Sequence, residues 1–313
     1  MSVEVLFEER TFLSADGRTR VHGYIWRPQG VMPKAIIQLS HGMCEYVLRY
    51  TEWAHRFCEA GYVFCGNDHL GHGHTAPDEE ELGFTASKNG AAYLVEDLHI
   101  MSAIVKAEFP GVPLVLYGHS MGSFAARVYL SHYGEELAAA LISGTAGPEQ
   151  PTGLALKVAH AVAAMKGERH RSGFLTSLAF GSYNKRFREE NDVHAWLTRE
   201  RSVREAYAKD PFCHFIFTAA GYDTLFTLLN DVSRKEWAQT VSKTLPVLLF
   251  AGEEDPVGNY GKGVRKIYER LQKAGCRGVQ LRLYPEGRHE MHNETNRDEV
   301  FADLITFLEG TLA

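Results

Sequence analysis

A serine between two glycines has the surroundings that most directly suggest chemistry. The sequence Gly118-His119-Ser120-Met121-Gly122 matches the pattern G-x-S-x-G, in which a serine occupies a tight turn from a strand into a helix. The glycines allow strand and helix to close around a strained turn while the serine oxygen stays accessible. A helix that starts at Met121 would also point free N–H groups and a positive dipole end at the reacting centre. The pattern therefore predicts that Ser120 is a nucleophile for acyl transfer.

A base and an acid for Ser120 are expected in loops after later strands. A serine hydroxyl needs a base to remove its proton, and a carboxylate must hold that base in the correct tautomer. In chains with this motif the order is serine, then acid, then histidine. Asp255 follows the apolar run 246–250, and His289 follows the run 279–284. We therefore predict that Ser120, His289 and Asp255 form one hydrogen-bonded line.

Other residues compete for these two roles. Glu253 and Glu254 share the loop of Asp255, which we prefer because a proline directly after it stiffens the chain. His292 is the rival base, three residues beyond the predicted one. Asp97 is a further acid, but it precedes the nucleophile and lies within a helical pattern. These alternatives remain open at the level of the sequence.

Acyl transfer also needs donors for the oxyanion that develops in the transition state. At least two preorganised N–H groups are required. We expect one to be the amide of Met121, directly after the nucleophile, and the other the amide of Met43, in the loop after the apolar run 35–39. The prediction concerns the two backbone amides and not the methionine side chains.

A zinc site is a different interpretation of the histidine-rich loop. His69, His72 and His74 follow Asp68 within seven residues, and such clusters can bind metal. The spacing does not place two histidines on one helix face, and glycine-rich loops often carry surface histidines. We therefore predict that the chain uses no metal and no organic cofactor, whereas a zinc hydrolase would be inhibited by chelators.

Length, composition and charge exclude several classes of protein. The chain has 313 residues, of which 45% are hydrophobic and 23% charged, as in ordinary soluble proteins. The net charge of −6 and the lack of a dense basic run argue against nucleic acid as a partner. No apolar run is long enough to span a membrane, and the acidic N-terminus does not resemble a signal peptide. The five cysteines are widely spaced and odd in number, which favours free thiols and a cytoplasmic location.

Apolar runs and helical patterns alternate along most of the chain. Residues 3–26 predict an opening hairpin with its turn at 15–18. Further strands are expected at 35–39, 62–66, 114–117, 246–250 and 279–284, and helices at 51–60, 90–109, 123–133, 263–274 and 298–308. Short strands that are apolar throughout predict a mostly parallel α/β sheet covered by helices on both faces.

The alternation lapses in the middle of the chain. Ser120 and Asp255 are 135 positions apart, whereas the two helices and two strands expected between them need only about 50 residues. The surplus carries helical apolar patterns at 154–165 and 219–229. We therefore predict a core of residues 1–146 and 238–313 and an inserted helical cap of residues 147–237.

With these residues assembled, the chain resembles the monoacylglycerol lipase and lysophospholipase branch of the α/β-hydrolases, a serine aminopeptidase-like group. Five motifs carry the resemblance: HGMCEY at 41–46 with Arg49-Tyr50, D-x-x-G-H-G at 68–73, GHSMG at 118–122, G-x-x-D at 252–255, and G-x-H-E at 287–290. The resemblance implies the α/β-hydrolase fold and the same three catalytic residues. It says much less about the substrate.

Two residues depart from the family pattern H-G-x-[GA]-E-H. Cys44 replaces the small residue and Tyr46 replaces the histidine, so the shape of the alcohol-side pocket does not follow from the resemblance. Our candidate substrate contacts are Glu45, Tyr46, Phe212 and Phe215. Two further phenylalanines, Phe217 and Phe226, are open to the same interpretation, although aromatic residues in helical patterns more often belong to a core.

The resulting hypothesis is a serine carboxylic-ester hydrolase that forms an acyl-enzyme. Monoacylglycerols or similar single-chain lipid esters are the expected substrates, and the cap is expected to make at most transient contact with a membrane surface. A lysophospholipase, a short-chain carboxylesterase, a peptidase and an acyltransferase are the alternatives among enzymes. A catalytically silent ligand-binding homologue is the alternative from another class.

Overall fold

The computed structural model describes residues 3–148 and 152–312, and within them eight strands form one sheet. In sheet order the strands are β1 (Val5–Leu13), β2 (Arg20–Pro28), β4 (Val63–Asn67), β3 (Ile36–Ser40), β5 (Leu114–His119), β6 (Ala139–Ser143), β7 (Val247–Gly252) and β8 (Val279–Tyr284). β1 and β2 form the predicted antiparallel hairpin, and β2 is antiparallel to β4. The remaining neighbours are parallel, which confirms the predicted sheet.

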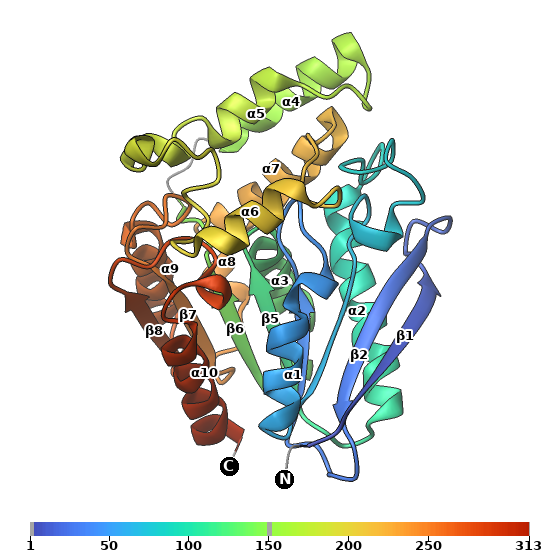
Figure 1. Ribbon diagram of the computed structural model, residues 1–313, viewed down its shortest axis with the longest axis vertical. Helices are drawn as coiled ribbons and strands as arrows, with labels where there is room; N and C mark the ends of the chain where they lie inside the picture. The colour runs from blue at the N-terminus through green and yellow to red at the C-terminus, as the bar shows by residue number, and fades with distance from the viewer. Residues whose placement is uncertain (1–2, 149–151, 313) are drawn as a thin grey trace.

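Helices cover both faces of this sheet (Figure 1). The α-helices of the described residues are α1 (Thr51–Glu59), α2 (Gly90–Glu108), α3 (Met121–Tyr133), α4 (Thr152–Lys166), α5 (Gly173–Phe180), α6 (Arg201–Lys209), α7 (Ala219–Ser233), α8 (Trp237–Thr240), α9 (Lys262–Lys273) and α10 (Arg297–Leu312). α1 and α10 pack on one face, and α2, α3 and α9 pack on the other. None of the helices in residues 3–148 and 152–312 has the length and apolar character that crossing a membrane requires.

Alternate residues of the central strands supply two hydrophobic cores. In β3, Ile36 faces the core under α2 and α3, while Ile37 faces the core under α1 and α10. In β7, Leu249 faces the core under α2 and α3, and Leu248 faces the core under α1 and α10. Because both faces of the sheet are buried at β3 and β7, these central strands are apolar on both sides, and this pattern made them recognisable in the sequence.

The chain between β6 and β7, residues 144–246, which we call the inserted segment, contributes helices α4 to α8 and, in the part that the structure describes, no strand to the sheet. α4 packs along α7, and α7 in turn packs against α2 and α3. α4 and α5 lie farthest from the sheet, at the end of the molecule opposite both termini (Figure 1). Residues 149–151 of the predicted cap, and residues 1–2 and 313 of the predicted core, lie outside the described residues.

A buried arginine connects both ends of this segment to the core. The guanidinium of Arg127, in α3, donates to Thr145 Oγ1 at 3.2 Å, to the Ala146 carbonyl at 3.1 Å and to the Val232 carbonyl at 2.8 Å. It also lies 4.2 Å from the ring centroid of Trp237. Burial lowers the pKa of Arg127 to about 9. The start of the segment and its last helices are therefore held by one side chain of α3.

Candidate active site

Ser120 lies on the turn between β5 and α3, at the carboxyl edge of the sheet. Its backbone has φ 52° and ψ −123°, a conformation that a residue with a side chain rarely adopts. The turn is held by the Ser120 amide, which donates to the Ser143 carbonyl at 3.1 Å, and by the Ser123 amide, which donates to the Ser120 carbonyl at 2.9 Å. Such strain is kept only where the surrounding structure fixes it, as it does here.

The two glycines of the motif are required by the close packing of this turn. A Cβ atom at Gly122 would lie 2.0 Å from the Ser40 carbonyl oxygen and 2.3 Å from that of His41. A Cβ atom at Gly118 would lie 2.6 Å from the Ala126 Cβ. Side chains at either position would therefore separate α3 from β3 and β5 and displace the serine.

His289 and Asp255 complete a hydrogen-bonded line with the serine. His289 Nε2 lies 2.8 Å from Ser120 Oγ, and His289 Nδ1 lies 3.0 and 3.1 Å from the two carboxylate oxygens of Asp255. Asp255 Oδ1 also accepts the Val257 amide at 2.9 Å, which fixes the carboxylate. With Nδ1–H donated to Asp255, Nε2 is free to accept the serine proton.

The surroundings of His289 make it a stronger base than a free imidazole. Both His289 and Asp255 are buried. Burial alone would lower the pKa of His289, but the charge of Asp255 and its hydrogen bond outweigh burial, so the pKa is raised above its ordinary value. The carboxylate thus favours the imidazolium that would form when the serine loses its proton.

The two predicted oxyanion donors lie beside the serine. Met121 is the first residue of α3, so its amide has no acceptor within the helix. Met43 lies in the loop after β3, and among the described residues its amide has no hydrogen-bond acceptor. The side chains of both methionines line the same cavity as Ser120. Their assignment as oxyanion donors remains a prediction.

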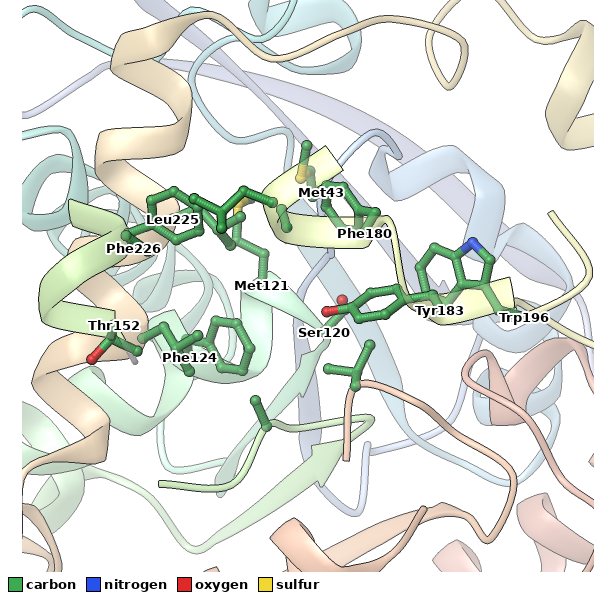
Figure 2. Close-up of a pocket in the computed structure, with 16 residues that line it drawn as sticks. Met43, Ser120, Met121, Phe124, Thr152, Phe180, Tyr183, Trp196, Leu225 and Phe226 are labelled. Atoms are coloured by element: carbon green, nitrogen blue, oxygen red, sulfur yellow. The ribbon is translucent and has the colours of Figure 1, made fainter. Parts of the chain in front are cut away.

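A cavity of about 110 Å³ opens beside Ser120, and its lining is mostly apolar. Its walls are Met43, Met121, Phe124, Ala146, Thr152, Ala155, Leu178, Ala179, Phe180, Tyr183, Trp196, Leu225, Phe226, Leu229 and Val257. Figure 2 shows Tyr183 and Trp196 on one side of Ser120, and Phe124, Leu225 and Phe226 on the other. The inserted helices α4, α5 and α7 thus build much of the wall.

The inserted segment also contacts the loop that carries the histidine. We call residues 195–199 the strap. The His289 amide donates to the Trp196 carbonyl at 3.3 Å, and the Glu290 amide donates to the Leu197 carbonyl at 2.7 Å. The Trp196 ring lies 5.0 Å from the imidazole of His289. The strap therefore supports the backbone of the histidine loop and covers one side of the imidazole.

The chain matches a known protein family over most of its length. Residues 32–296 match the family described as serine aminopeptidase, S33. The chain belongs to this family. It is therefore an S33-type α/β-hydrolase, as the motifs predicted, and its fold class is confirmed.

Named relatives of this S33-type hydrolase are esterases and lipases. The monoacylglycerol lipase of Mycolicibacterium smegmatis is 28% identical over 307 residues, which cover 97% of this chain and 98% of the relative. The monoglyceride lipase of Rattus norvegicus is 30% identical over 311 residues, which cover 96% of this chain and 90% of the relative. A crystal structure of a thermostable carboxyl esterase from Bacillus coagulans is 30% identical, with a TM-score of 0.92 over 98% of this chain and 99% of that one. The chain is a hydrolase of the esterase and lipase type.

The rival acids of this hydrolase contact partners other than the histidine. Glu254 pairs with Arg186 at 2.9 Å, and Glu253 lies 3.8 Å from Arg265. Asp97 accepts the hydroxyl of Ser14 at 2.8 Å, and so anchors the turn of the opening hairpin. Burial raises the pKa of Asp97 to about 6. These contacts give each of the three acids a structural partner other than His289.

The rival base, His292, is buried. The ring of His292 stacks on Tyr50 at 4.3 Å and lies 4.9 Å from His119. Within the described residues its two ring nitrogens have no hydrogen-bond partner, and burial lowers its pKa to about 3. Of the described imidazoles, the one hydrogen-bonded to Ser120 is that of His289.

The histidines of the loop at 68–74 each have a hydrogen-bond partner within the protein. His69 lies 3.2 Å from the Ser40 hydroxyl, His72 bonds to a backbone carbonyl, and His74 bonds to a tyrosine hydroxyl. Burial lowers the pKa of His69 to about 3 and that of His72 to about 4. Asp68 accepts the His74 amide at 2.9 Å. No group of three or more potential metal ligands forms within residues 3–148 and 152–312.

Glu45, a predicted substrate contact, lies in a buried polar cluster that joins two loops of the site. Its carboxylate accepts the Gly42 amide and the Tyr50 hydroxyl, the latter at 3.0 Å. Arg49 bonds to Glu45 at 2.9 Å and to Glu290 at 3.1 Å. Burial raises the pKa of Glu45. The cluster therefore links the loop of the predicted oxyanion donor to the loop of His289.

Aromatic residues predicted to bind substrate have different positions. The cavity lining, as far as the structure describes it, does not include the four predicted contacts Glu45, Tyr46, Phe212 and Phe215. Phe226 lines the cavity, whereas Phe217 is buried in the core. The roles of the four residues therefore remain predictions.

Several residues of the site were not found by the sequence reasoning. Phe124 lies one helical turn after Ser120, and this spacing alone could have placed it on the same side of α3. Phe180, Tyr183 and Trp196 belong to the inserted segment. Their contribution depends on how this segment folds over the sheet, for which the sequence carries no local signal.

Proposed function

We propose that this hydrolase cleaves carboxylic esters through an acyl-enzyme on Ser120, with His289 as general base and Asp255 orienting the histidine. The observation that carries the proposal is the hydrogen-bonded line of Ser120, His289 and Asp255 at the wall of an apolar cavity. The strained turn at Ser120 supports it as well, because such strain concentrates at functional sites.

Acylation begins when Ser120 Oγ attacks the ester carbonyl. His289 Nε2 takes the hydroxyl proton as the new O–C bond forms, and Asp255 stabilises the imidazolium. The carbonyl oxygen becomes an oxyanion that accepts hydrogen bonds from the amides of Met43 and Met121. The bond to the alcohol oxygen then breaks, and His289 gives its proton to the leaving alcohol.

Deacylation repeats these steps with water as the nucleophile. His289 Nε2 removes a proton from water as the oxygen attacks the acyl carbonyl. The same two amides stabilise the second oxyanion. The bond to Ser120 Oγ breaks, the proton returns from His289 to the serine, and a carboxylic acid leaves.

We infer that the acyl group comes from a single-chain lipid, and that monoacylglycerols are the preferred substrates. Relatives with this activity in their names align over nearly the whole chain, and the cavity wall is apolar. The cavity of about 110 Å³ is smaller than a pocket for a drug-sized ligand, about 300 Å³ or more. We infer that the inserted helices move away from α3 to admit a long acyl chain.

The inserted helices also suit brief contact with a lipid surface. Leu154 and Met165 of α4 are 65% and 73% exposed, and Phe174 of α5 is 63% exposed. Lys157 and Lys166 lie on the same helix as the first two. Exposed apolar side chains interleaved with cations favour the surface of an anionic bilayer, where single-chain lipids are dissolved.

The nucleophile is tested by labelling with a fluorophosphonate. We expect the reagent to modify Ser120, located by peptide mass spectrometry, and Ser120→Ala to abolish both labelling and ester turnover. Labelling that persists in Ser120→Ala would reject the assignment. Absence of labelling in the wild-type chain would favour a silent ligand-binding homologue.

The substrate class is tested with a panel of esters. Monoacylglycerols of several acyl lengths are compared with lysophospholipids, short-chain nitrophenyl esters and the corresponding amides. We expect the highest kcat/KM for monoacylglycerols with medium or long chains. A maximum at acetyl or butyryl esters would assign a short-chain carboxylesterase, and a maximum at lysophospholipids a lysophospholipase.

A further inference from the structure

The loop that follows β3 carries the predicted oxyanion donor and is bonded to the inserted segment by two side chains. The Tyr46 hydroxyl donates to Asp210 Oδ2 at 2.8 Å. The Cys44 thiol donates to the carbonyl oxygen of Phe215 at 3.4 Å. Both partners belong to the short stretch 210–215 after α6. Met43 therefore precedes two residues that attach the loop to the inserted segment.

The acceptor of the tyrosine hydroxyl is itself fixed. Asp210 Oδ1 accepts the Phe212 amide at 2.9 Å, and the Asp210 carbonyl accepts the amides of Cys213 and His214, each at 3.0 Å. The Tyr46 ring also packs 5.3 Å from the ring of Phe212. Tyr46 is thus bonded to a turn with its own internal hydrogen bonds, which gives the loop a stable point of attachment.

The loop needs such an attachment because its backbone is strained. Cys44 has φ 54°, in the left-handed region that normally favours glycine. The Gly42 amide is held by the buried carboxylate of Glu45. Met43 lies between these two fixed points, so a shift of the loop at Cys44 or Tyr46 would change where the Met43 amide points.

Cys44 and Tyr46 are also the two positions at which this chain departs from H-G-x-[GA]-E-H. We propose that Tyr46 is a positioning residue that, through its hydrogen bond to Asp210, holds the Met43 amide in place for the oxyanion. The inference rests on the proposed function. The inference extends the proposed function by making the inserted segment part of the apparatus that stabilises the transition state. It also gives Tyr46 a role other than substrate contact.

The test is Tyr46→Phe, which removes the hydroxyl and keeps the ring. A misplaced oxyanion donor weakens binding of the transition state more than binding of the substrate. We therefore expect kcat for a monoacylglycerol to fall about tenfold while KM changes by less than about twofold. Active sites are counted with a fluorophosphonate, so that the loss of kcat is expressed per competent Ser120.

A matched control and a double-mutant cycle separate positioning from general stability. Tyr133 also donates to a carboxylate, that of Glu96 at 2.7 Å, but does so on α3 away from the oxyanion loop. We expect Tyr133→Phe to keep both kcat and KM. Asp210→Ala should lower kcat as Tyr46→Phe does, and the double variant should be no slower than the slower single variant.

Three outcomes would overturn the inference. An unchanged kcat in Tyr46→Phe rejects positioning outright. A rise in KM with constant kcat would make Tyr46 a substrate contact instead. Additive losses in the double variant would show that Tyr46 and Asp210 act separately. If wild-type Ser120 were not labelled at all, the proposed function would fail first, and this result is distinct from the other three.

Discussion

At the scale of single residues, His289 shows how burial and charge oppose each other. Its ring is buried, which disfavours the imidazolium, yet the adjacent carboxylate of Asp255 favours it more. A general base works best when its pKa lies near the pH of the reaction. The raised pKa of His289 therefore suits a base that must hold the serine proton and then return it.

The pH dependence of turnover follows from this balance. The base must be neutral, so we expect kcat/KM to increase with pH through the pKa of His289, with a midpoint above the ordinary value of about 6.5. Asp255→Asn removes the charge that raises this pKa. The midpoint should therefore move to lower pH, and kcat should fall about ten-thousandfold because the tautomer is no longer held.

The comparison uses pH profiles of the wild type, Asp255→Asn and Glu254→Gln with a soluble ester. Glu254 is in the same loop but pairs with Arg186, so its substitution should leave the midpoint and the rate unchanged. If the midpoint moved in Glu254→Gln and stayed fixed in Asp255→Asn, Glu254 and not Asp255 would be the acid that orients His289.

The three residues of the predicted triad could be placed from sequence because each follows a strand that the sequence pattern predicts. Ser120, Asp255 and His289 come after β5, β7 and β8, and the carboxyl ends of parallel strands meet at one edge of the sheet. Trp196 and Asp210 follow no strand, and their partners lie far away in the sequence. Only the folded path of the inserted segment brings them to the site.

At the scale of elements, α4 and α5 have two apolar sides. Ala155 of α4 and Phe180 of α5 face the cavity, whereas Leu154 and Phe174 are exposed to solvent. A helix of a soluble protein normally keeps one polar face. Apolar residues on the outer side therefore suggest that this side meets an apolar phase during part of the catalytic cycle.

Vesicle binding tests this interpretation. We expect the wild type to sediment with anionic phosphatidylglycerol vesicles and the double variant Leu154→Ser, Phe174→Ser to sediment at least about tenfold less, since each buried apolar side chain contributes roughly 1.5–3 kcal/mol. Met32→Ser is the matched control. Met32 is 77% exposed and precedes β3, at the edge of the sheet away from the site. Equal loss for the control would contradict the idea.

Elements were predicted well where their residues carry a clear strand or helix pattern and less well where small residues or glycine weaken that pattern. β8 has the predicted bounds, and α2 differs by one residue at its end. α3 begins at Met121, as the serine motif led us to expect, although Gly122 in its first turn conceals the helical pattern before residue 123. β6, with the sequence AALIS, was not assigned a range, since small residues carry little strand signal.

At the scale of the whole molecule, Arg127 joins the inserted segment to the core. It is buried, and the groups it meets among the described residues are carbonyls, one hydroxyl and an aromatic ring. Buried carbonyls that lose their donor stay desolvated without a hydrogen bond. The arginine is therefore expected to stabilise the fold and to fix how the inserted segment lies on α3.

Replacement of this arginine should lower stability. We expect Arg127→Met to reduce the free energy of unfolding by about 1–3 kcal/mol, because the carbonyls of Ala146 and Val232 lose their donor. The measurement is denaturation in urea followed by circular dichroism. Arg201→Met is the control, since Arg201 is exposed and pairs with Glu205 within one helix. Equal stability of Arg127→Met and the wild type would show that the contacts to Ala146 and Val232 are dispensable.

The strap has a consequence for attempts to recombine this enzyme with its relatives. The carbonyls of Trp196 and Leu197 accept the amides of His289 and Glu290, so the histidine loop is partly scaffolded by a stretch from the middle of the sequence. A chimaera that exchanges everything between β6 and β7 would replace that scaffold together with much of the cavity wall. Grafts that retain residues 195–199 should preserve turnover while altering the preference for acyl-chain length. The exchanged region should therefore exclude the strap.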